Sequence, residues 1–307
     1  MRDYLARFKK VLASLERWIM EPVDPRPLGL FRLWFGFLCL VNLALLWPDM
    51  PMWFGNDGVL PPEVHQRMTS GFRISFYTFT GYSDHAIVMM RLFGFLGGLG
   101  LLTGIFPRTS AFLTWMTASS IAWRNADILN SGDNLIRIGS FFLIFARSGE
   151  SFNLVNLVQA WRGRPNSPYR TKIPAWPQRI LQLQLCIVYF VAGVWKAKGD
   201  PWLDGSAVGT VLQLGEFQRF PIPDFVMTPF GSSVLTFFTL GFELAFPFLV
   251  WVPRLRVPVL VMGLSLHAGL EWMMNVQLFQ WVITSYYLLF LRFKKNQFDK
   301  ESIKTDA

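Results

Sequence analysis

The sequence predicts an all-α protein, a polytopic transmembrane helical bundle of about eight spans, and three observations carry this prediction. Hydrophobic residues fill 52% of the 307 positions and charged residues 16%, below the roughly 25% of a soluble domain. The 30 Phe and 13 Trp exceed what one soluble core of this length holds. The apolar residues also come in blocks of about 20, the length of a helix that crosses a bilayer.

The expected spans are apolar blocks punctuated by Pro, Gly or basic residues: Leu28–Trp47, Ala86–Phe106, Ser110–Trp123, Leu135–Ala146, Ile180–Lys196, Ser232–Val252, Val257–Met273 and Val276–Leu291. The third and fourth are short, so tilted or buried helices are open alternatives there. Residues 1–22 place apolar side chains at helical spacing among basic ones, which predicts an amphipathic helix on the inner membrane surface. Residues 23–292 are the expected transmembrane domain, and 293–307 a basic cytoplasmic tail.

The basic residues predict the orientation of the chain. With the N-terminus in the cytoplasm, 20 of the 29 Lys and Arg residues fall in cytoplasmic segments, as the positive-inside rule requires. We therefore expect both termini in the cytoplasm, with residues 48–84, 124–133 and 199–231 on the outer face. The same distribution argues against nucleic acid as the partner of a chain with a net charge of +9.

Glycines and cysteines inside the spans have packing explanations. Two small-residue pairs on the second span, Gly94/Gly98 and Gly100/Gly104, let another helix approach closely. Packing within the chain is the favoured explanation, and dimerisation is the alternative, so the oligomeric state stays open. The two cysteines, Cys39 and Cys186, lie in apolar blocks, which favours buried thiols over a disulfide or a metal site.

Ionisable side chains inside spans are costly and are therefore candidates for function. Arg32 lies near the inner end of its span and either snorkels to the surface or closes a structural salt bridge. Arg91 and Arg137 lie in the outer parts of their spans, where each either binds an anionic group or pairs with Asp127 or Asp133.

Two further ionisable groups lie on later spans. Glu243 lies near the middle of its span and needs a partner or a proton. His267 lies in the outer half of its helix, and Glu271 follows four residues later on the same face. This pair either orients a ring nitrogen or is a satisfied polar contact. The turn 123–133, which includes Arg124, is dense in polar groups and predicts the polar wall of a membrane-level cavity.

Lys196 carries the most weight, because it ends an apolar block that begins at Ile180. A lysine at mid-bilayer costs roughly 2.5–3.5 kcal/mol on insertion scales. Desolvation favours the neutral amine, which can act as a base or a nucleophile. No Walker, Rossmann, HExxH, GxSxG or CxxC pattern occurs, which argues against an ATPase, a dehydrogenase or a classical hydrolase.

Several segments together resemble the HTTM domain, the membrane domain shared by vitamin K-dependent gamma-carboxylases and many bacterial proteins. Three of them are Arg26–Gly36, Trp53–Leu60 and Ser131–Arg137. The segment Tyr189–Lys196 is similar to a family motif, Tyr-Phe-x-Ala-Gly-Val followed by two lysines, with Trp195 in place of the first lysine. Asn275–Phe279 is similar to the family's Asn-x-Gln-Leu-Phe, and His267 corresponds to its upstream histidine at a different spacing.

The resemblance implies that Lys196 is the catalytic base, with His267 as a second catalytic residue. In the family, the lysine amine deprotonates a reduced naphthoquinone, oxygen adds, and a quinone-derived base removes a proton from a glutamate side chain, whose carbanion traps carbon dioxide. The resemblance thus implies a lyase or oxygenase with a reduced quinone as cofactor and no metal. The residues that we expect around the substrate are Arg91, Arg124, Asp133, Arg137, Glu243 and Glu271.

The chain ends at Ala307 without the large lumenal domain of the carboxylases, so we expect a reaction other than protein glutamate carboxylation. The first hypothesis is an enzyme of the bacterial inner membrane, with its active face periplasmic or extracellular, that acts on a quinone or lipid-linked substrate. The alternative is a non-catalytic factor for peptide or lipoprotein maturation or export, in which Lys196 closes an ion pair. A transporter is less favoured, because paired broken helices and repeat halves are lacking.

Overall fold

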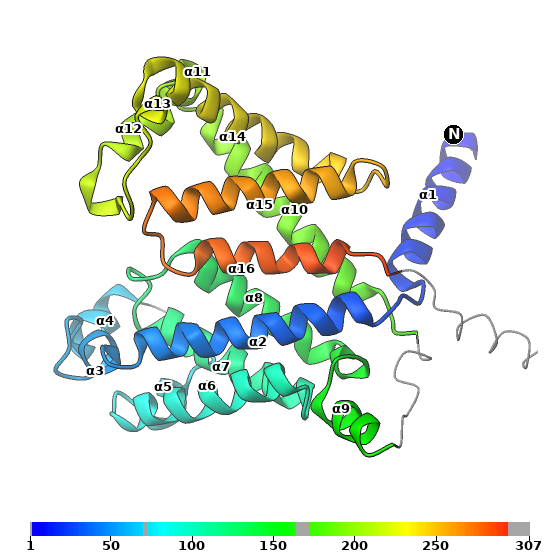
Figure 1. Ribbon diagram of the computed structural model, residues 1–307. Helices are drawn as coiled ribbons and strands as arrows, with labels where there is room; N and C mark the ends of the chain where they lie inside the picture. Colours follow the sequence, from blue (N-terminus) through cyan, green and yellow to red (C-terminus); the bar gives the residue numbers. More distant parts are fainter. Residues whose placement is uncertain (1, 70, 72, 164–171, 294–307) are drawn as a thin grey trace, which may run out of the picture. The chain divides into compact units, whose positions relative to one another are not determined.

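The structure is a computed structural model that describes residues 2–69, 71, 73–163 and 172–293 (Figure 1). Helix accounts for 74% of it, and the described residues form no strand. The first helices are α1 (Arg2–Met20), α2 (Arg26–Leu46), α3 (Met50–Phe54), α4 (Pro62–Met68), α5 (Phe76–Thr80), α6 (His85–Thr103), α7 (Pro107–Arg124), α8 (Ser131–Phe145) and α9 (Leu154–Trp161). The later ones are α10 (Trp176–Lys196), α11 (Asp200–Leu203), α12 (Ala207–Leu212), α13 (Asp224–Met227), α14 (Pro229–Leu249), α15 (Arg256–Met273) and α16 (Phe279–Ser285).

Every expected span contains helix, and four helices in the described part of the chain are long and apolar enough to cross a membrane. These are α2, α6, α10 and α14. The all-helical multi-pass architecture is therefore confirmed. The last expected span, Val276–Leu291, differs from its prediction: α16 begins only at Phe279 and passes into a 3-10 helix at Tyr286–Phe290. The late start has a local cause, since Gln277 adopts φ 49°, a left-handed conformation that interrupts a helix.

The chain divides into two compact units. Unit 1 comprises residues 1–129, 133–180 and 291–307, and unit 2 comprises 130–132 and 181–290. The division falls inside α10, between residues 180 and 181. Residues 164–171 lie outside the described part of the chain. The expected basic tail likewise lies outside it from residue 294 onward.

In unit 1, α2, α6 and α7 lie side by side (Figure 1). Glycines of α6 permit this, because a Cβ on Gly97 would lie 2.8 Å from the Thr114 backbone nitrogen, and one on Gly98 would lie 2.8 Å from Leu40. The small-residue face of α6 thus serves packing within the chain, as the sequence favoured. Both cysteines are buried thiols, also as expected.

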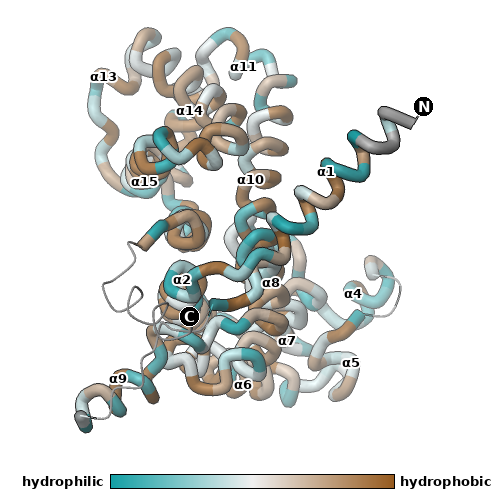
Figure 2. Tube along the Cα trace, turned by 90° about the vertical axis from the view of Figure 1, so that its right-hand side faces the viewer, coloured by the Kyte–Doolittle hydropathy of each residue, from teal (hydrophilic) through white to brown (hydrophobic). Residues whose placement is uncertain are grey.

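Helix α1 alternates hydrophilic and hydrophobic residues (Figure 2). Its apolar side chains Phe8, Leu12 and Leu15 are exposed, as the prediction of a membrane-surface helix requires.

Unit 2 is organised around α10 and α14, which run antiparallel where they touch, since Tyr189 meets Phe246 whereas Lys196 meets Glu243. The connection 199–231 was expected as an outer loop. It instead forms three short helices that pack on the first half of α14, where the Gly209 amide donates to the Ser232 hydroxyl (2.8 Å).

Candidate active site

Lys196 and Glu243 form an ion pair between α10 and α14. The Lys196 Nζ lies 2.5 Å from Oε1 and 2.7 Å from Oε2 of Glu243. The two side chains are only 26% and 10% exposed. Lys196 occupies the last turn of α10, where the helix dipole favours a cation. The sequence analysis singled out both residues, and the structure brings them together.

The motif before Lys196 explains how the two helices come close enough for this pair. A Cβ on Gly193 would lie 3.2 Å from the Leu244 backbone nitrogen and 2.8 Å from the Leu244 side chain. Any larger residue would separate the helices at the turn next to the pair. The glycine of the motif is therefore a packing requirement for the contact between Lys196 and Glu243.

The contact joins different parts of the two helices. Glu243 lies 14 residues after the first residue of α14, which is about 21 Å along the helix axis at the usual rise of a helix. Glu243 therefore lies in the second half of α14, whereas Lys196 is the last residue of α10, and both helices have the length of a membrane span. Trp202, on α11, places its ring 5.1 Å from the Lys196 Nζ, so an aromatic surface covers one side of the amine.

His267 belongs to a second, buried polar cluster in unit 2. The Tyr189 hydroxyl lies 2.5 Å from the His267 Nε2 and 2.5 Å from the Tyr287 hydroxyl. The other ring nitrogen, Nδ1, bonds to Oε1 of Gln280. Both ring nitrogens are thus used, so His267 is held in place by Tyr189 and Gln280 and not by Glu271.

Two features of the helices explain the position of this cluster. Gly263, one turn before His267, leaves room for the Tyr287 hydroxyl, because a Cβ there would lie 2.2 Å from that oxygen. Tyr189 lies seven residues, or two helical turns, before Lys196 and thus on the same face of α10. The histidine cluster and the lysine pair therefore lie along one face of one helix.

A cavity of about 480 Å³ adjoins the cluster. Its wall combines aromatic and aliphatic side chains with a few polar ones; the lining residues are Arg219, Phe220, Leu264, His267, Ala268, Glu271, Trp272, Gln280, Trp281 and Thr284. Arg219 and Glu271 form an ion pair with each other. Glu271 is thus a wall residue of the cavity whose charge is balanced by Arg219. An apolar cavity with a few convergent polar groups is the usual form of a small-molecule site.

The remaining predicted site residues belong to unit 1. Arg124 is fully buried and donates to the carbonyl oxygens of Gly55 (2.9 Å) and Leu60 (2.5 Å), so it holds the outer segment in place. Arg91 donates to the Trp47 carbonyl (2.7 Å) and lies over the Trp47 ring. These two arginines therefore make structural contacts with backbone carbonyls.

Asp133 and Arg137 lie on α8 and face different cavities. Asp133 lines a small one of about 40 Å³ with Asn42 and Thr117. Arg137 donates to Oδ1 of Asn134 (3.0 Å) and lines a large cavity of unit 1. Arg32 follows neither alternative that the sequence left open, since it is fully buried and donates to the Phe152 carbonyl (2.5 Å).

Several residues of the site escaped the sequence interpretation. Tyr189, Gln280 and Tyr287 were not singled out as site residues. A spacing signal was present, since Tyr189 lies seven residues before Lys196 and Gln280 lies seven residues before Tyr287. His65, in unit 1, was also missed. It is buried and bonds to the Tyr82 hydroxyl (2.5 Å).

The environment of His65 is electrostatically unfavourable for a positive charge. Burial lowers the pKa of His65 below its usual value, and the positive charges of Arg124 and Arg73 lower it further, while a hydrogen bond to the Trp123 carbonyl (2.8 Å) acts in the opposite direction. The ring is therefore neutral at neutral pH, and it ties α4 to the end of α7.

Comparison with known proteins assigns the family. No solved structure matches the chain. The model of the HTTM domain family matches residues 20–294, which include the Lys196–Glu243 pair and the His267 cluster. Since the match covers nearly the whole sequence, the chain belongs to the HTTM domain family of membrane proteins, which is related to the vitamin K-dependent carboxylases.

Proposed function

We propose that this protein is a membrane-embedded enzyme in which Lys196 is the base and Glu243 is its proton partner, acting on a lipid-soluble quinol or a lipid-linked substrate. One observation carries the proposal: the Lys196 Nζ lies 2.5 and 2.7 Å from the Glu243 oxygens where α10 meets α14, and both helices are long and apolar enough to cross a membrane. A base between two such helices is open to lipid-soluble molecules from the surrounding hydrocarbon.

The pair supplies a neutral amine without separating charge. When an Nζ proton moves to the Glu243 carboxylate, an ion pair becomes a neutral amine and a neutral acid. In a low-dielectric site this exchange costs far less than removing a proton from an isolated lysine, because both charges vanish together. The free amine then accepts the proton of the substrate's acidic hydroxyl, which is general base catalysis.

The cavity beside His267 fits a reduced quinone. Its volume of about 480 Å³ suits a bicyclic ring, and Trp272 and Trp281 offer flat surfaces on which such a ring can stack. Gln280 and His267 place polar groups in its wall for the oxygens at the ring edge. A bound quinol would supply redox chemistry that no side chain of this chain possesses. The chain's own residues would bind and orient the ring, and Lys196 lies outside the described lining of this cavity.

We also propose that all eight predicted spans cross a bacterial inner membrane, with both termini in the cytoplasm. The charge distribution along the sequence supports this topology. In this orientation α11, which carries Trp202, lies on the periplasmic side of Lys196. We therefore expect the substrate to approach from the outer half of the bilayer.

A second candidate function rests on the same pair. An ion pair that is satisfied in the resting structure is also what a non-catalytic factor for peptide or lipoprotein maturation or export would contain, with Lys196 and Glu243 joining two helices. The two functions differ in what they require of the amine, since the enzyme needs a titratable nitrogen and the factor needs only a stable junction.

The test uses purified protein in liposomes supplied with a reduced naphthoquinone and with oxygen as the oxidant. The enzyme proposal expects quinol consumption by the wild type, and its loss in Lys196→Met protein that is folded and equally abundant. Lys198→Met is the matched control, because Lys198 lies two residues away and contacts the exposed Trp195 ring instead of Glu243. Equal turnover by the wild type and Lys196→Met would contradict the proposal.

A further inference from the structure

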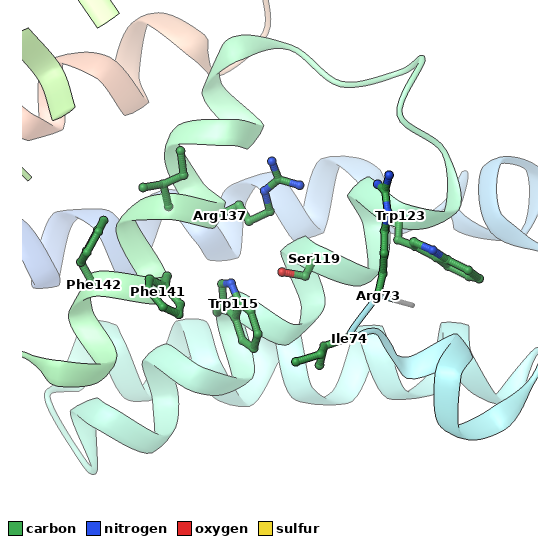
Figure 3. Close-up of a pocket in the computed structure, with 9 residues that line it drawn as sticks. Arg73, Ile74, Trp115, Ser119, Trp123, Arg137, Phe141 and Phe142 are labelled. Carbon is green, nitrogen blue, oxygen red and sulfur yellow. The ribbon is translucent and has the colours of Figure 1, made fainter. Parts of the chain in front are cut away.

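The large cavity of unit 1 has a different composition from the one in unit 2. Its volume is about 500 Å³. Trp115, Ser119 and Trp123, which are spaced four apart on α7, form one wall, because residues at this spacing share a helix face. Figure 3 shows Trp115 and Ser119 beside Arg137 and Phe141 of α8, while the Trp123 ring turns away toward His65, Tyr77 and Tyr82.

Helix α8 supplies the opposite wall. Arg137 and Phe141 are four apart, so they share a face, and Phe142 follows next to them. The Trp115 and Phe141 rings are 5.7 Å apart, and this contact closes the apolar part of the cavity.

Positive charge gathers toward one end of the cavity. Figure 3 shows the guanidinium groups of Arg73 and Arg137 toward one end and Phe141 and Phe142 toward the other, with Ser119 between them. No acidic side chain is among the described residues that line the cavity. Arg137 Nη2 donates to the side-chain amide of Asn134, which is neutral, so this contact does not balance the charge of the arginine.

We propose that this cavity binds an anionic phospholipid, with the headgroup phosphate between Arg73 and Arg137 and an acyl chain against Trp115 and Phe141. The two ends of the cavity match the two ends of such a lipid. Guanidinium groups bind phosphate with two parallel hydrogen bonds, and tryptophans favour the level of the headgroups. The site is formed by residues of unit 1 alone and does not depend on the reaction proposed for Lys196.

The charge of the site selects the class of lipid. A zwitterionic lipid carries an ammonium group next to its phosphate, which the two arginines that line the cavity would repel. Phosphatidylglycerol has the phosphate without that cation. We therefore expect preference for phosphatidylglycerol over phosphatidylcholine, and this preference distinguishes a lipid site from unspecific filling of an apolar groove.

The experiment is a titration of the full-length protein in detergent with phosphatidylglycerol, followed by native mass spectrometry. The wild type is expected to retain phosphatidylglycerol more tightly than phosphatidylcholine. In the double variant Arg73→Gln/Arg137→Gln we expect affinity at least about tenfold weaker, because charge-assisted hydrogen bonds to the phosphate are lost. The control Arg108→Gln/Arg254→Gln removes two exposed arginines that do not line the cavity. Its net charge equals that of the Arg73→Gln/Arg137→Gln variant.

Three results of this experiment would contradict the proposal. Equal losses in the double variant and the control, or equal binding of both lipids by the wild type, would overturn it. Displacement of the lipid by millimolar inorganic phosphate would also overturn it, since the site would then bind a free anion. If the double variant does not fold, Arg73→Gln alone serves, because this side chain is exposed, and several-fold weaker binding is expected.

Discussion

The two fully buried arginines of unit 1 and the partly buried lysine of unit 2 have different kinds of partner. Arg32 and Arg124 bind backbone carbonyls. Lys196, whose side chain is 26% exposed, binds the Glu243 carboxylate. A carbonyl cannot accept a proton at any ordinary pH, so the arginine contacts can only hold the chain in place. A carboxylate can, and the contact of Lys196 with Glu243 is therefore the one suited to proton transfer.

The largest effect is expected in unit 1. Arg32→Met removes the bonds to the Ser151 and Phe152 carbonyls and leaves both acceptors buried, which should cost about 3–5 kcal/mol of unfolding free energy. Thermal unfolding in detergent and abundance in membranes measure it. A loss below about 1 kcal/mol would show that the carbonyls find other donors.

The second-largest effect distinguishes the two units by whether a second substitution restores the lost stability. Glu243→Leu leaves the Lys196 ammonium without its partner and should cost about 3 kcal/mol. Adding Lys196→Met should recover most of this loss, because replacing both members of a buried pair by apolar groups is close to neutral. Arg32→Met should have no such second-site rescue, since no side-chain charge opposes it among its hydrogen-bond partners. Failure of the double variant to recover would mean that the pair is not an isolated contact.

A smaller effect concerns the histidine cluster. Gly263→Ala places a methyl group 2.2 Å from the Tyr287 hydroxyl, which must move away from Tyr189, at an expected cost of about 1–3 kcal/mol. Gly241→Ala is the matched control, because its Cβ would meet no atom within 4 Å and alanine favours a helix. The melting temperatures of the two variants should therefore shift in opposite directions or by clearly different amounts.

The smallest effect is a pH dependence of unit 1. Since the pKa of His65 is lowered in the folded state, protonation favours unfolding, and stability is lost as the pH falls through and below the unfolded value of about 6.5. One proton gives a slope of at most about 1.4 kcal/mol per pH unit. Comparing melting temperatures at pH 7.5 and 5.5 checks this. Substitution by Gln should remove that part of the slope, and an unchanged slope would assign it to other groups.

Apolar block length was sufficient to predict the four long apolar helices α2, α6, α10 and α14, because a bilayer sets the length of a span and a helix satisfies its own backbone. The same reasoning identified Lys196 and Glu243, since charges within apolar blocks are rare. In the ion-pair alternative it offered Glu243 as one possible partner of Lys196, but a separation of 47 residues carries no periodic signal that could single out this carboxylate.

The partners of the buried arginines were harder to predict. Arg32 and Arg124 bind carbonyl oxygens, and every residue carries a carbonyl, so the sequence has no composition signal for such a contact. The short helices at 200–227 were missed for another reason. They are four to six residues long, too short for hydrophobic periodicity to show, and they form because they pack on α14.

The account depends most on the amine of Lys196 exchanging a proton with Glu243. The most direct test is quinol consumption by the double variant Lys196→Met/Glu243→Leu in liposomes, compared with the wild type at equal abundance. We predict that this variant is stable and inactive, because the junction is restored while the base is absent. A stable variant with wild-type turnover would contradict the account and leave the pair a structural junction.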